Sequence, residues 1–441
     1  MKEPRIHVGI MAKRSIEAVL SGSFLCNGKT VEGEQRFDRS SQGILWNGIE
    51  YDSLLLTPAD ETTASFMLKG VTIGIGFHWQ REEEQRFMGS LQLIGEGENI
   101  RVINHVKAEE YLRSVISSEM SATSSVELLK AHAVISRSWL LAQIAKRNRI
   151  DAACTPYCPD METADEIIRW YDREDHRDYD VCADDHCQRY QGITRASTAA
   201  VDEAIDGTYG EVLCYDGKIA DARFSKCCGG ATECFESCWE PVHHPYLTTV
   251  RDNKTGYLPD LRCESQARKW ILSAPDSFCN TDNPAVLLQI LNGYDRETTR
   301  FYRWTVRYGQ QELSELVRRR SGIDFGTITD LQPVERGKSG RIVRLRIAGT
   351  RRSLIVGKEL EIRRWLSESH LYSSAFIVER ESTANGENCF ILHGAGWGHG
   401  VGLCQIGAAV MGAEGYNYDK ILSHYFHGAK LTQLYQQENN R

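Results

Sequence analysis

Residues 111–139, YLRSVISSEMSATSSVELLKAHAVISRSW, carry the clearest structural signal in this chain. Leu112, Val115 and Ile116 recur at the spacing of one face of a helix. Glu119 continues the same stripe, four residues after Val115 and three after Ile116. A carboxyl on a buried face tends to keep its proton near neutral pH, as a general acid requires. The alternative is a solvated glutamate at a frayed helix end.

A second helix is expected to follow directly. Ser124 or Ser125 is a suitable N-cap, and Glu127 falls in the first turn, where an acidic residue is favoured. The apolar pattern extends this helix to about Arg147. The stretch therefore predicts two consecutive helices with Glu119 near their junction.

The rest of the chain predicts an α+β fold in four segments. Residues 1–95 form a β-rich N-terminal segment, with strand-like runs such as VTIGIGFHW and LQLIGEG. Residues 96–259 form a helical core that carries a Cys/His loop. Residues 260–340 are interpreted as an inserted helical segment, with ARKWILSAP and QELSELVRRRSG. Residues 341–441 combine strands, IVRLRIAG and AFIVERE, with a glycine-rich motif and a closing helix.

Composition excludes several classes of function. A net charge of -8 gives no electrostatic footprint for nucleic acid. No run of eighteen apolar residues occurs, so no membrane-spanning segment is expected. The N-terminal sequence MKEPRIHVGIMAKRSIEAVL is interrupted by charges and is not expected to be a signal peptide. Either the protein is cytosolic or an export signal has been removed from the numbered chain.

The 14 cysteines are clustered, and some of them stand beside histidines. One such group has the two imidazoles and two thiols that suit tetrahedral zinc: His176, Cys182, His186 and Cys187. The alternative is that the cysteines are core thiols or a disulfide and the histidines are solvated. A further group can form a second site or two disulfides and stays unassigned: Cys154, Cys158, Cys234 and Cys238.

Residues 394–408, GAGWGHGVGLCQIGA, contain six glycines, which let the backbone approach a ligand closely. The motif lacks the GK[ST] ending of a phosphate loop, so a nucleotide site is not expected. His399 and Gln405 are its polar side chains, and Trp397 offers an aromatic platform suited to a sugar. The alternative is a tight structural turn with a core tryptophan.

Together these blocks resemble the SpoIID family, which is named for stage II sporulation protein D and includes the LytB amidase enhancers. YLRSVISSEM followed by ELLKAHAVISRSW is similar to the family's YL-x-GV-x-x-EM and a run such as ALKAQAVAARTY. HCQRYQG and the stretch up to GGATE resemble its Q-x-Y-x-G, T-x-G-x-VL-x-Y and GG-x-TE patterns. GWGHGVGLCQIGA resembles its C-terminal signature. The resemblance covers about residues 100–240 and 340–432.

The resemblance implies a peptidoglycan lytic transglycosylase, a carbon–oxygen lyase that cleaves denuded glycan strands between MurNAc and GlcNAc with a 1,6-anhydro product. The family's catalytic acid, in the EM motif, maps to Glu119, which would act as general acid and then base. The His-Cys-His-Cys arrangement of zinc-bearing members maps to the four candidate ligands named above. This zinc is expected to be structural, because four protein ligands leave no open position.

Four side chains are candidates for holding the sugar: Arg137, Tyr190, His399 and Gln405. Arg137 has an alternative role, which is to tie two helices together. Two departures from the family pattern are Cys404, where serine is common, and Ser225, where histidine is common.

Two other functions stay open. The chain can be a non-catalytic, glycan-binding enhancer of an N-acetylmuramoyl-L-alanine amidase. A zinc amidase or peptidase is disfavoured, because no HExxH motif occurs and the metal ligands are saturated. The expected partners are peptidoglycan glycan strands and an amidase that removes stem peptides. This substrate places the protein in the cell envelope, outside the cytoplasm (periplasm).

Overall fold

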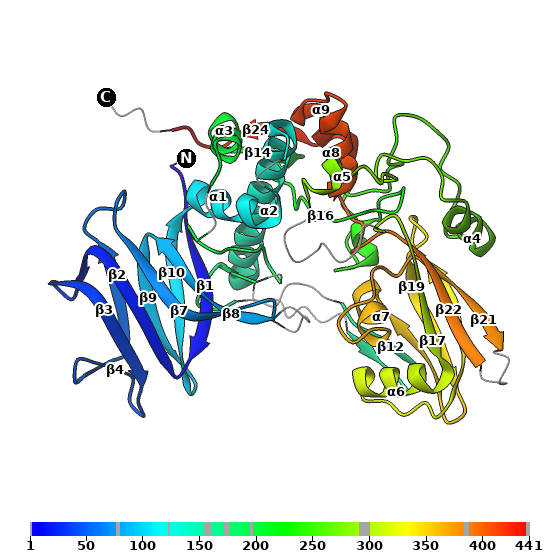
Figure 1. Cartoon of the computed structure of the whole chain (residues 1–441), viewed down its shortest axis with the longest axis horizontal. Coiled ribbons are helices and arrows are strands. Elements are labelled where there is room, and N and C mark those ends of the chain that lie inside the picture. Colours follow the sequence, from blue (N-terminus) through cyan, green and yellow to red (C-terminus); the bar gives the residue numbers. More distant parts are fainter. Residues whose placement is uncertain are drawn as a thin grey trace. The chain divides into compact units, whose positions relative to one another are not determined.

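The computed structural model describes residues 2–75, 80–121, 124–153, 160–170, 176–184, 186–194, 197–290, 300–382 and 388–437, with the backbone alone for 148–153. The chain forms two compact units (Figure 1). Unit 1 comprises Met1–Asn148, Asp175–Val212 and Thr432–Arg441, and unit 2 comprises Arg149–Glu174 and Leu213–Leu431. Among the described residues, no helix is both long and apolar enough to cross a membrane.

Unit 1 begins with a long run of strands. They are β1 (Arg5–Lys13), β2 (Ser15–Cys26), β3 (Lys29–Arg39), β4 (Ile44–Trp46), β5 (Ile49–Tyr51), β6 (Ser53–Pro58), β7 (Ser65–Ile73), β8 (Arg81–Met88), β9 (Ser90–Glu96) and β10 (Asn99–Lys107). Their sheet has the order β13-β1-β10-β9-β6-β2-β3-β4-β5, with β7 paired to β2 and β8. In β2, the buried residues Ile16, Ala18 and Leu20 alternate with more exposed neighbours, as a half-buried strand requires. The β-rich N-terminal segment predicted from the sequence is present.

Two helices follow this sheet, and Figure 1 shows them in cyan beside the blue strands. Helix α1 (Ala108–Glu119) continues directly from β10, and α2 (Val126–Ala153) begins one residue after Ser125. The hydroxyl of Ser125 accepts a hydrogen bond from the Leu128 N–H at 3.4 Å, as an N-cap does. The predicted start of the second helix is therefore confirmed.

Two short elements complete the part of unit 1 near these helices. Strand β13 (Val181–Cys182) lies parallel to β1, with Gly9 opposite Cys182. Helix α3 (Ala199–Gly207) is capped by Thr198, and two of its acidic residues, Asp202 and Asp206, bind the Arg113 guanidinium on α1. These pairings fix the segment between β13 and α3 against the sheet and α1.

Unit 2 mixes short strands and helices. Its elements are β11 (Met161–Glu162), β12 (Glu166–Ile168), β15 (Lys218–Ile219), β16 (Phe224–Ser225), a 3-10 turn (Phe235–Ser237), α4 (Glu264–Ser273), α5 (Pro284–Leu287), β17 (Arg303–Gly309), α6 (Gln310–Ser321), β18 (Ile328–Arg336), β19 (Ile342–Gly349), β20 (Ser353–Gly357), α7 (Glu359–Trp365), β21 (Phe376–Ser382), β22 (Asn388–Ala395), β23 (Leu403–Cys404), α8 (Gln405–Ala413) and α9 (Tyr418–Tyr425). Strands β14 (Glu211–Tyr215) and β24 (Lys430–Gln433) span the boundaries of the two units.

The core of unit 2 lies around two sheets, β11-β12-β20-β19-β18 and β17-β22-β21. Buried side chains from both sheets and from α6 and α7, such as Leu392, Leu345, Leu316 and Trp365, form one cluster. The segment 260–340 thus contributes strands β17 and β18 as well as the predicted helices, and it is not purely helical.

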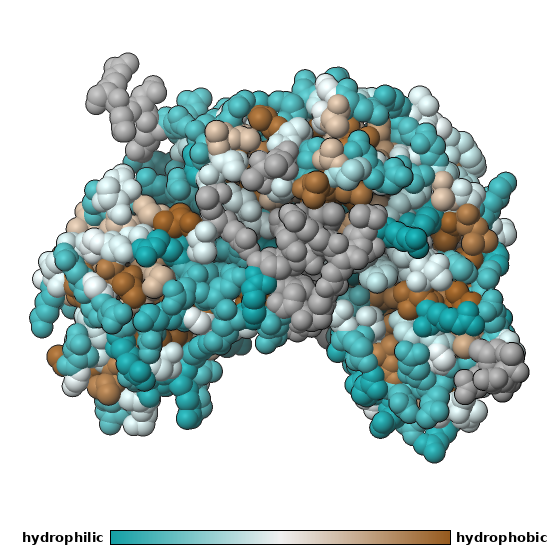
Figure 2. All heavy atoms as spheres, viewed as in Figure 1, coloured by the Kyte–Doolittle hydropathy of each residue, from teal (hydrophilic) through white to brown (hydrophobic). Residues whose placement is uncertain are grey.

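On the face shown in Figure 2, hydrophilic side chains cover most of the coloured surface. The mixed helix and strand content agrees with the predicted α+β class. Two cysteines of the unassigned group, Cys154 and Cys158, lie outside the described residues. The other two, Cys234 and Cys238, are buried free thiols.

Candidate functional site

Glu119 is the last residue of α1, and its side chain is partly buried. The apolar stripe before it is fully buried, since Leu112, Val115 and Ile116 have no exposed surface. The backbone turns extended at Met120 (φ -121°, ψ 157°), so α1 ends at Glu119. The predicted stripe is therefore present, and its carboxyl stands at the point where the helix ends.

The carboxyl of Glu119 contacts the loop that carries the metal candidates. The backbone N–H of Arg189 donates a hydrogen bond to Glu119 Oε1 at 3.2 Å. Arg189 follows Cys187 by two residues. Between them, Gln188 is buried and its Oε1 accepts a hydrogen bond from the Tyr111 hydroxyl of α1 at 3.3 Å. The Cys/His loop thus lies directly against the end of α1.

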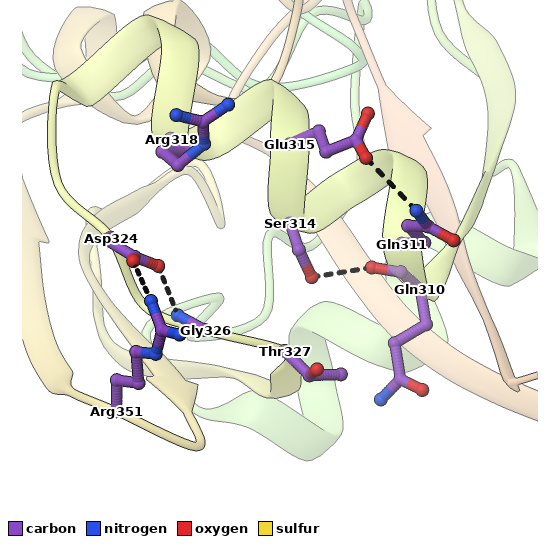
Figure 3. Close-up of a pocket in the computed structure, with 9 residues that line it drawn as sticks. All are labelled: Gln310, Gln311, Ser314, Glu315, Arg318, Asp324, Gly326, Thr327 and Arg351. Carbon is purple, nitrogen blue, oxygen red and sulfur yellow. Dashed lines mark hydrogen bonds and ion pairs between the residues drawn. The ribbon is translucent and has the colours of Figure 1, made fainter.

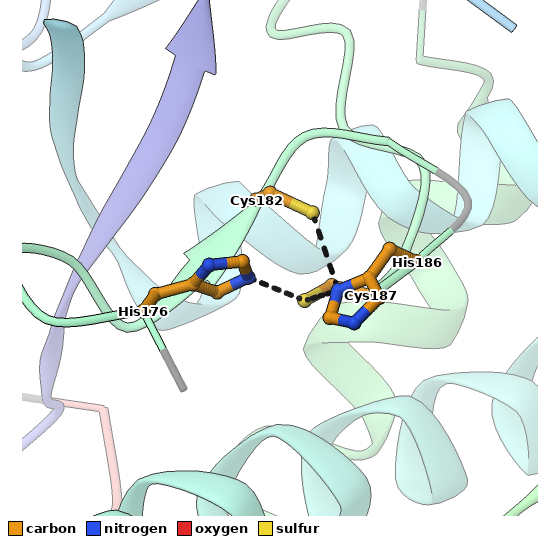
Figure 4. Close-up of side chains that lie close together, drawn as sticks. All are labelled: His176, Cys182, His186 and Cys187. Atoms are coloured by element: carbon orange, nitrogen blue, oxygen red, sulfur yellow. Dashed lines mark hydrogen bonds between the residues drawn. The ribbon is translucent and has the colours of Figure 1, made fainter. Parts of the chain in front are cut away.

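Figure 4 shows the four predicted metal ligands converging on one point. His176, Cys182, His186 and Cys187 offer ligand atoms that all lie within 4.8 Å of one another. Cys187 Sγ is 3.5 Å from His176 Nε2 and 3.5 Å from His186 Nδ1, and Cys182 Sγ is 3.8 Å from His186 Nδ1. Tetrahedral zinc with ordinary Zn–S and Zn–N bonds separates S from N by about 3.6 Å. The residues present therefore fit zinc.

Electrostatics favours metal ligation at this cluster. A hydrogen bond with Cys187 holds the pKa of the Cys182 thiol far below its ordinary value; the two histidines act in the same direction, and burial opposes them. A thiolate is the form that binds a metal. The ring of His176 stacks on Tyr179 at 4.5 Å. Gly9 of β1 makes room for this tyrosine, since a Cβ there would lie 2.6 Å from the Tyr179 ring.

Asp180 fastens the same loop, although no sequence pattern pointed to this residue. Its carboxylate accepts the backbone N–H of His7 at 2.8 Å and pairs with Arg147 at 3.1 Å. Arg147 also donates to the Tyr179 carbonyl at 2.8 Å. The loop is therefore tied to both β1 and α2 beside the four ligands.

Arg137 and Tyr190, two of the four candidate sugar ligands, lie in the interior of unit 1. The Arg137 guanidinium has no exposed surface and makes two hydrogen bonds to the Glu109 carboxylate, at 2.9 and 2.6 Å. The Tyr190 hydroxyl donates to Asn104 Oδ1 at 2.6 Å, and its ring stacks on Tyr111 at 5.1 Å. Both side chains are occupied by internal partners, so the structure favours the alternative of a helix tie for Arg137.

The glycine-rich motif of unit 2 packs against the SKCCGGATE turn, Ser225 to Glu233. Cys227 and Trp397 exchange two backbone hydrogen bonds, of 3.0 and 2.8 Å. The buried guanidinium of Arg341 donates to the Gly398 carbonyl at 3.0 Å and to the Cys228 carbonyl at 3.2 Å. Gly400 is required here, because its φ is +79° and a Cβ would lie 2.3 Å from Arg341 Cζ.

Trp397 and His399 have aromatic neighbours in this motif. Trp397 stacks on Tyr372 at 4.1 Å and contacts Phe301 at 4.9 Å. His399 is partly exposed; its Nδ1 accepts the Val401 N–H at 3.0 Å, and its ring lies 4.6 Å from Trp239. Burial among its neighbours lowers the pKa of His399 well below its ordinary value, and the charges of Arg223 and Arg341 add to this effect.

Gln405 is the first residue of α8 and is buried. Ser225, one of the two departures, lies in β16 directly opposite Cys404 of β23, the other departure. The Ser225 hydroxyl is buried and has no hydrogen-bond partner among the described residues.

A hollow on unit 2 is lined by none of the predicted site residues. It is lined by residues of α6 and of the loop after this helix, such as Gln310, Ser314 and Asp324, and by Arg351, which lies between β19 and β20 (Figure 3). Several lining groups bind one another: Gln311 with Glu315 at 3.1 Å, and Asp324 with Arg351 and the Gly326 N–H. These polar groups are therefore engaged with one another.

Comparisons with known proteins match two parts of the chain. The family described as stage II sporulation protein matches residues 96–215, which contain Glu119 and the four candidate zinc ligands. A domain of unknown function, DUF8618, matches residues 233–402, which contain His399. The two matches fall on the regions that carry the predicted motifs.

Individual relatives extend over most of the chain. An uncharacterized protein of Brachyspira hyodysenteriae is 26% identical over 346 residues, which are 78% of this chain and 72% of the relative. Stage II sporulation protein D of Bacillus subtilis is 24% identical over 333 residues, 75% of this chain and 76% of the relative. The amidase enhancer of the same organism is 24% identical over 332 residues, 73% of this chain and 40% of the enhancer. These matches support the assignment of the chain to the SpoIID/LytB family.

Proposed function

We propose that this protein is a peptidoglycan lytic transglycosylase that cleaves denuded glycan strands between MurNAc and GlcNAc, with Glu119 as general acid and then base. The observation that carries the proposal is the contact between the Glu119 carboxyl and the Arg189 N–H, two residues beyond Cys187. It joins the family's acid to the metal-ligand loop. A positioned carboxyl at a partly exposed helix end is accessible to a polymeric substrate.

The position of Glu119 suits a group that must give up a proton. The C-terminal end of α1 carries the negative end of the helix dipole, which disfavours an ionised carboxyl there. The Arg189 N–H supports the carboxylate that forms once the proton has left. The helix dipole thus favours the protonated acid, and the Arg189 N–H favours the carboxylate that then acts as the base.

The reaction needs one carboxyl. Protonated Glu119 donates its proton to the glycosidic oxygen, and the bond from that oxygen to C1 of MurNAc breaks. The Glu119 carboxylate then takes the proton of the MurNAc C6 hydroxyl, whose oxygen closes onto C1 to give the 1,6-anhydro ring. A hydrolytic glycosidase would need a second carboxyl to activate water or to act as a nucleophile. The GG-x-TE motif contains one further acid, Glu233, but its carboxylate is fully buried and accepts hydrogen bonds from the Lys338 N–H and the Ser339 hydroxyl.

Zinc at the Cys/His cluster would be structural. Bound by His176, Cys182, His186 and Cys187, it would hold the loop that presents the Arg189 N–H to Glu119. The proposed glycan contacts of His399 and Gln405 in unit 2 rest on their motif positions. Arg137 and Tyr190 are not part of this proposal, because their polar groups bind Glu109 and Asn104.

The similarity to an amidase enhancer supports one alternative, a non-catalytic protein that binds glycan and stimulates an amidase. Either function places the protein at the cell wall outside the cytoplasm, with peptidoglycan strands as ligand and an amidase as its functional partner.

The experiment is an assay on denuded glycan strands with no amidase present. The proposal expects 1,6-anhydro products from the wild type and their loss in Glu119→Gln. Glycan binding without any cleavage by the wild type would reject the lyase and favour the enhancer. Release of new amino termini from intact sacculi would favour the zinc amidase or peptidase instead.

A further inference from the structure

A second group of potential metal ligands lies in unit 2, whereas the Cys/His loop belongs to unit 1. Its members are Cys228, Asp252, Cys279 and Cys404, hereafter the buried cluster. All four are almost fully buried, and their ligand atoms lie within 4.8 Å of one another. We propose that the buried cluster binds a second zinc ion, with a structural role.

The distances in the buried cluster match a shared metal. Cys228 Sγ and Cys279 Sγ are 3.6 Å apart. Two thiolates on one tetrahedral zinc ion are separated by about 3.8 Å, whereas the sulfurs of a disulfide are separated by about 2 Å. Four protein ligands, three soft sulfurs and one carboxylate, give a closed set of the kind found at structural zinc sites.

The local geometry around Cys404 favours its thiolate form. Cys404 immediately precedes α8, and its sulfur accepts the Cys228 N–H at 3.2 Å. The positive end of a helix and a directed N–H both favour a thiolate.

Asp252 supplies an independent observation. Its side chain has no exposed surface, and its oxygens accept the Tyr425 hydroxyl at 2.7 Å and the Cys279 N–H at 3.0 Å. In the part of the chain that the structure describes, Asp252 has no basic partner. A buried carboxylate without a counter-ion is costly, and buried charges are ordinarily paired or bound to a metal. A zinc ion between Asp252 and the three cysteines would supply the missing positive charge.

The buried cluster joins segments that are distant in sequence. Cys228 lies in the turn that exchanges hydrogen bonds with Trp397, and Cys404 ends the glycine-rich motif. Asp252 and Cys279 come from two further loops, which meet through the bond from the Phe278 N–H to the Asp252 carbonyl at 2.7 Å. Zinc would therefore fasten the glycine-rich motif and α8 to two loops of unit 2. The stated departure at position 404, cysteine where serine is common, provides one of its ligands.

The experiment measures metal content per chain on the full-length protein purified without chelator, together with the oxidation state of the cysteines by intact mass. We expect two equivalents of zinc in the wild type. His176→Ala combined with Cys187→Ser should retain one equivalent, held by the buried cluster. Cys279→Ser should also retain one, held by the Cys/His loop. Cys234→Ser is the matched control, since Cys234 is an equally buried thiol of unit 2 outside both groups, and it should keep two.

Two further measurements test the proposal even if one of these variants fails to fold. Asp252→Asn keeps the shape of the side chain and should lower the affinity of the second equivalent on the order of tenfold or more. In the His176→Ala/Cys187→Ser protein, one equivalent of Co²⁺ should produce thiolate-to-metal charge-transfer absorption that Cys279→Ser abolishes. The proposal is overturned if the wild type holds one equivalent, if Cys228 and Cys279 form a disulfide, or if native Cys279 reacts with alkylating agents as readily as after chelation.

Discussion

Glu109 and Glu119 lie near opposite ends of α1, and the structure gives them opposite surroundings. Glu109 is buried and accepts hydrogen bonds from Arg137, the Gly210 N–H at 3.3 Å and the Tyr435 hydroxyl at 2.6 Å. Glu119 is partly exposed and accepts the Arg189 N–H of the Cys/His loop. The hydrogen-bonding capacity of the Glu109 carboxylate is thus taken up by buried partners, whereas the Glu119 carboxyl is partly exposed.

This difference separates a structural carboxyl from a chemical one on a single helix. A carboxylate that already holds a bidentate guanidinium cannot give or take a proton without breaking that pair. A carboxyl at a helix end with a backbone donor keeps part of its surface for a ligand. The same substitution made at both positions therefore tests the assignment of roles.

Glu119→Gln should have the largest effect on activity. Removal of a general acid lowers the rate by about 10²–10⁴-fold, and a partly exposed, nearly isosteric change alters stability by roughly 0.5 kcal/mol or less. The measurement is the initial rate of anhydro-product formation on denuded glycan, beside thermal unfolding of the same preparation. A Glu119→Gln protein that cleaves at the wild-type rate would remove Glu119 from the mechanism.

Glu109→Gln and Arg137→Ala should instead destabilise the fold. Each leaves one partner of a fully buried ion pair without its counter-charge, which costs about 3–5 kcal/mol of unfolding free energy. The matched control is Arg14→Ala, since the Arg14–Glu98 pair is 76% and 82% exposed and should contribute less than about 1 kcal/mol. Denaturant unfolding measures both. Retained stability in Arg137→Ala together with weaker glycan binding would restore Arg137 as a sugar ligand.

Much of this contrast could be predicted from local sequence, and the remainder could not. The apolar stripe of α1 and the cap at Ser125 are local patterns, so both helices were predictable. The ligands His176 and Cys187 lie within twelve positions of each other, and one loop brings them together. The role of Glu109 was not predictable, because its partners Arg137 and Tyr435 come from distant parts of the chain. Helical periodicity indicates which face of a helix is buried. It does not indicate which polar side chains from distant segments contact that face.

The predictions for unit 2 succeeded where the pattern is local and failed where the structure depends on distant segments. ARKWILSAP and QELSELVRRRSG are helices α4 and α6, as their periodicity indicated. Strand β17 was missed, because RWTVRYG is short and mixes charges with apolar residues. It is defined by its antiparallel partner β22, 80 or more positions later. The buried cluster was not predictable for the same reason, since its four ligands are spread from position 228 to 404.

Cys187→Ser should have an intermediate effect and sharpen the link between Glu119 and the Cys/His loop. Loss of a ligand should release the zinc and loosen the loop that carries the Arg189 N–H. Removal of groups that orient the residues of a site without contacting the substrate typically changes activity about 10–100-fold. Cys214→Ser, a thiol of similar burial outside both metal groups, is the control and should retain both zinc and activity. Full cleavage activity in a Cys187→Ser protein that has lost the zinc of the Cys/His loop would show that this zinc is not needed to position Glu119.

Tyr190→Phe should have the smallest effect. It tests whether the Tyr190 hydroxyl has a structural role, as Glu109 has, or a role in the site, as proposed for Glu119. The change removes the hydroxyl that donates to Asn104 Oδ1, a net loss of about 0.5–1.5 kcal/mol of unfolding free energy for a buried hydrogen bond. Its ring packing on Tyr111 and Phe87 is unaltered. The glycan KM should stay at the wild-type value, and Tyr257→Phe, at an 84% exposed position, should change neither quantity. If the KM of Tyr190→Phe rose severalfold while stability stayed constant, the hydroxyl would have to meet the sugar, and the buried state seen here would have to open during binding.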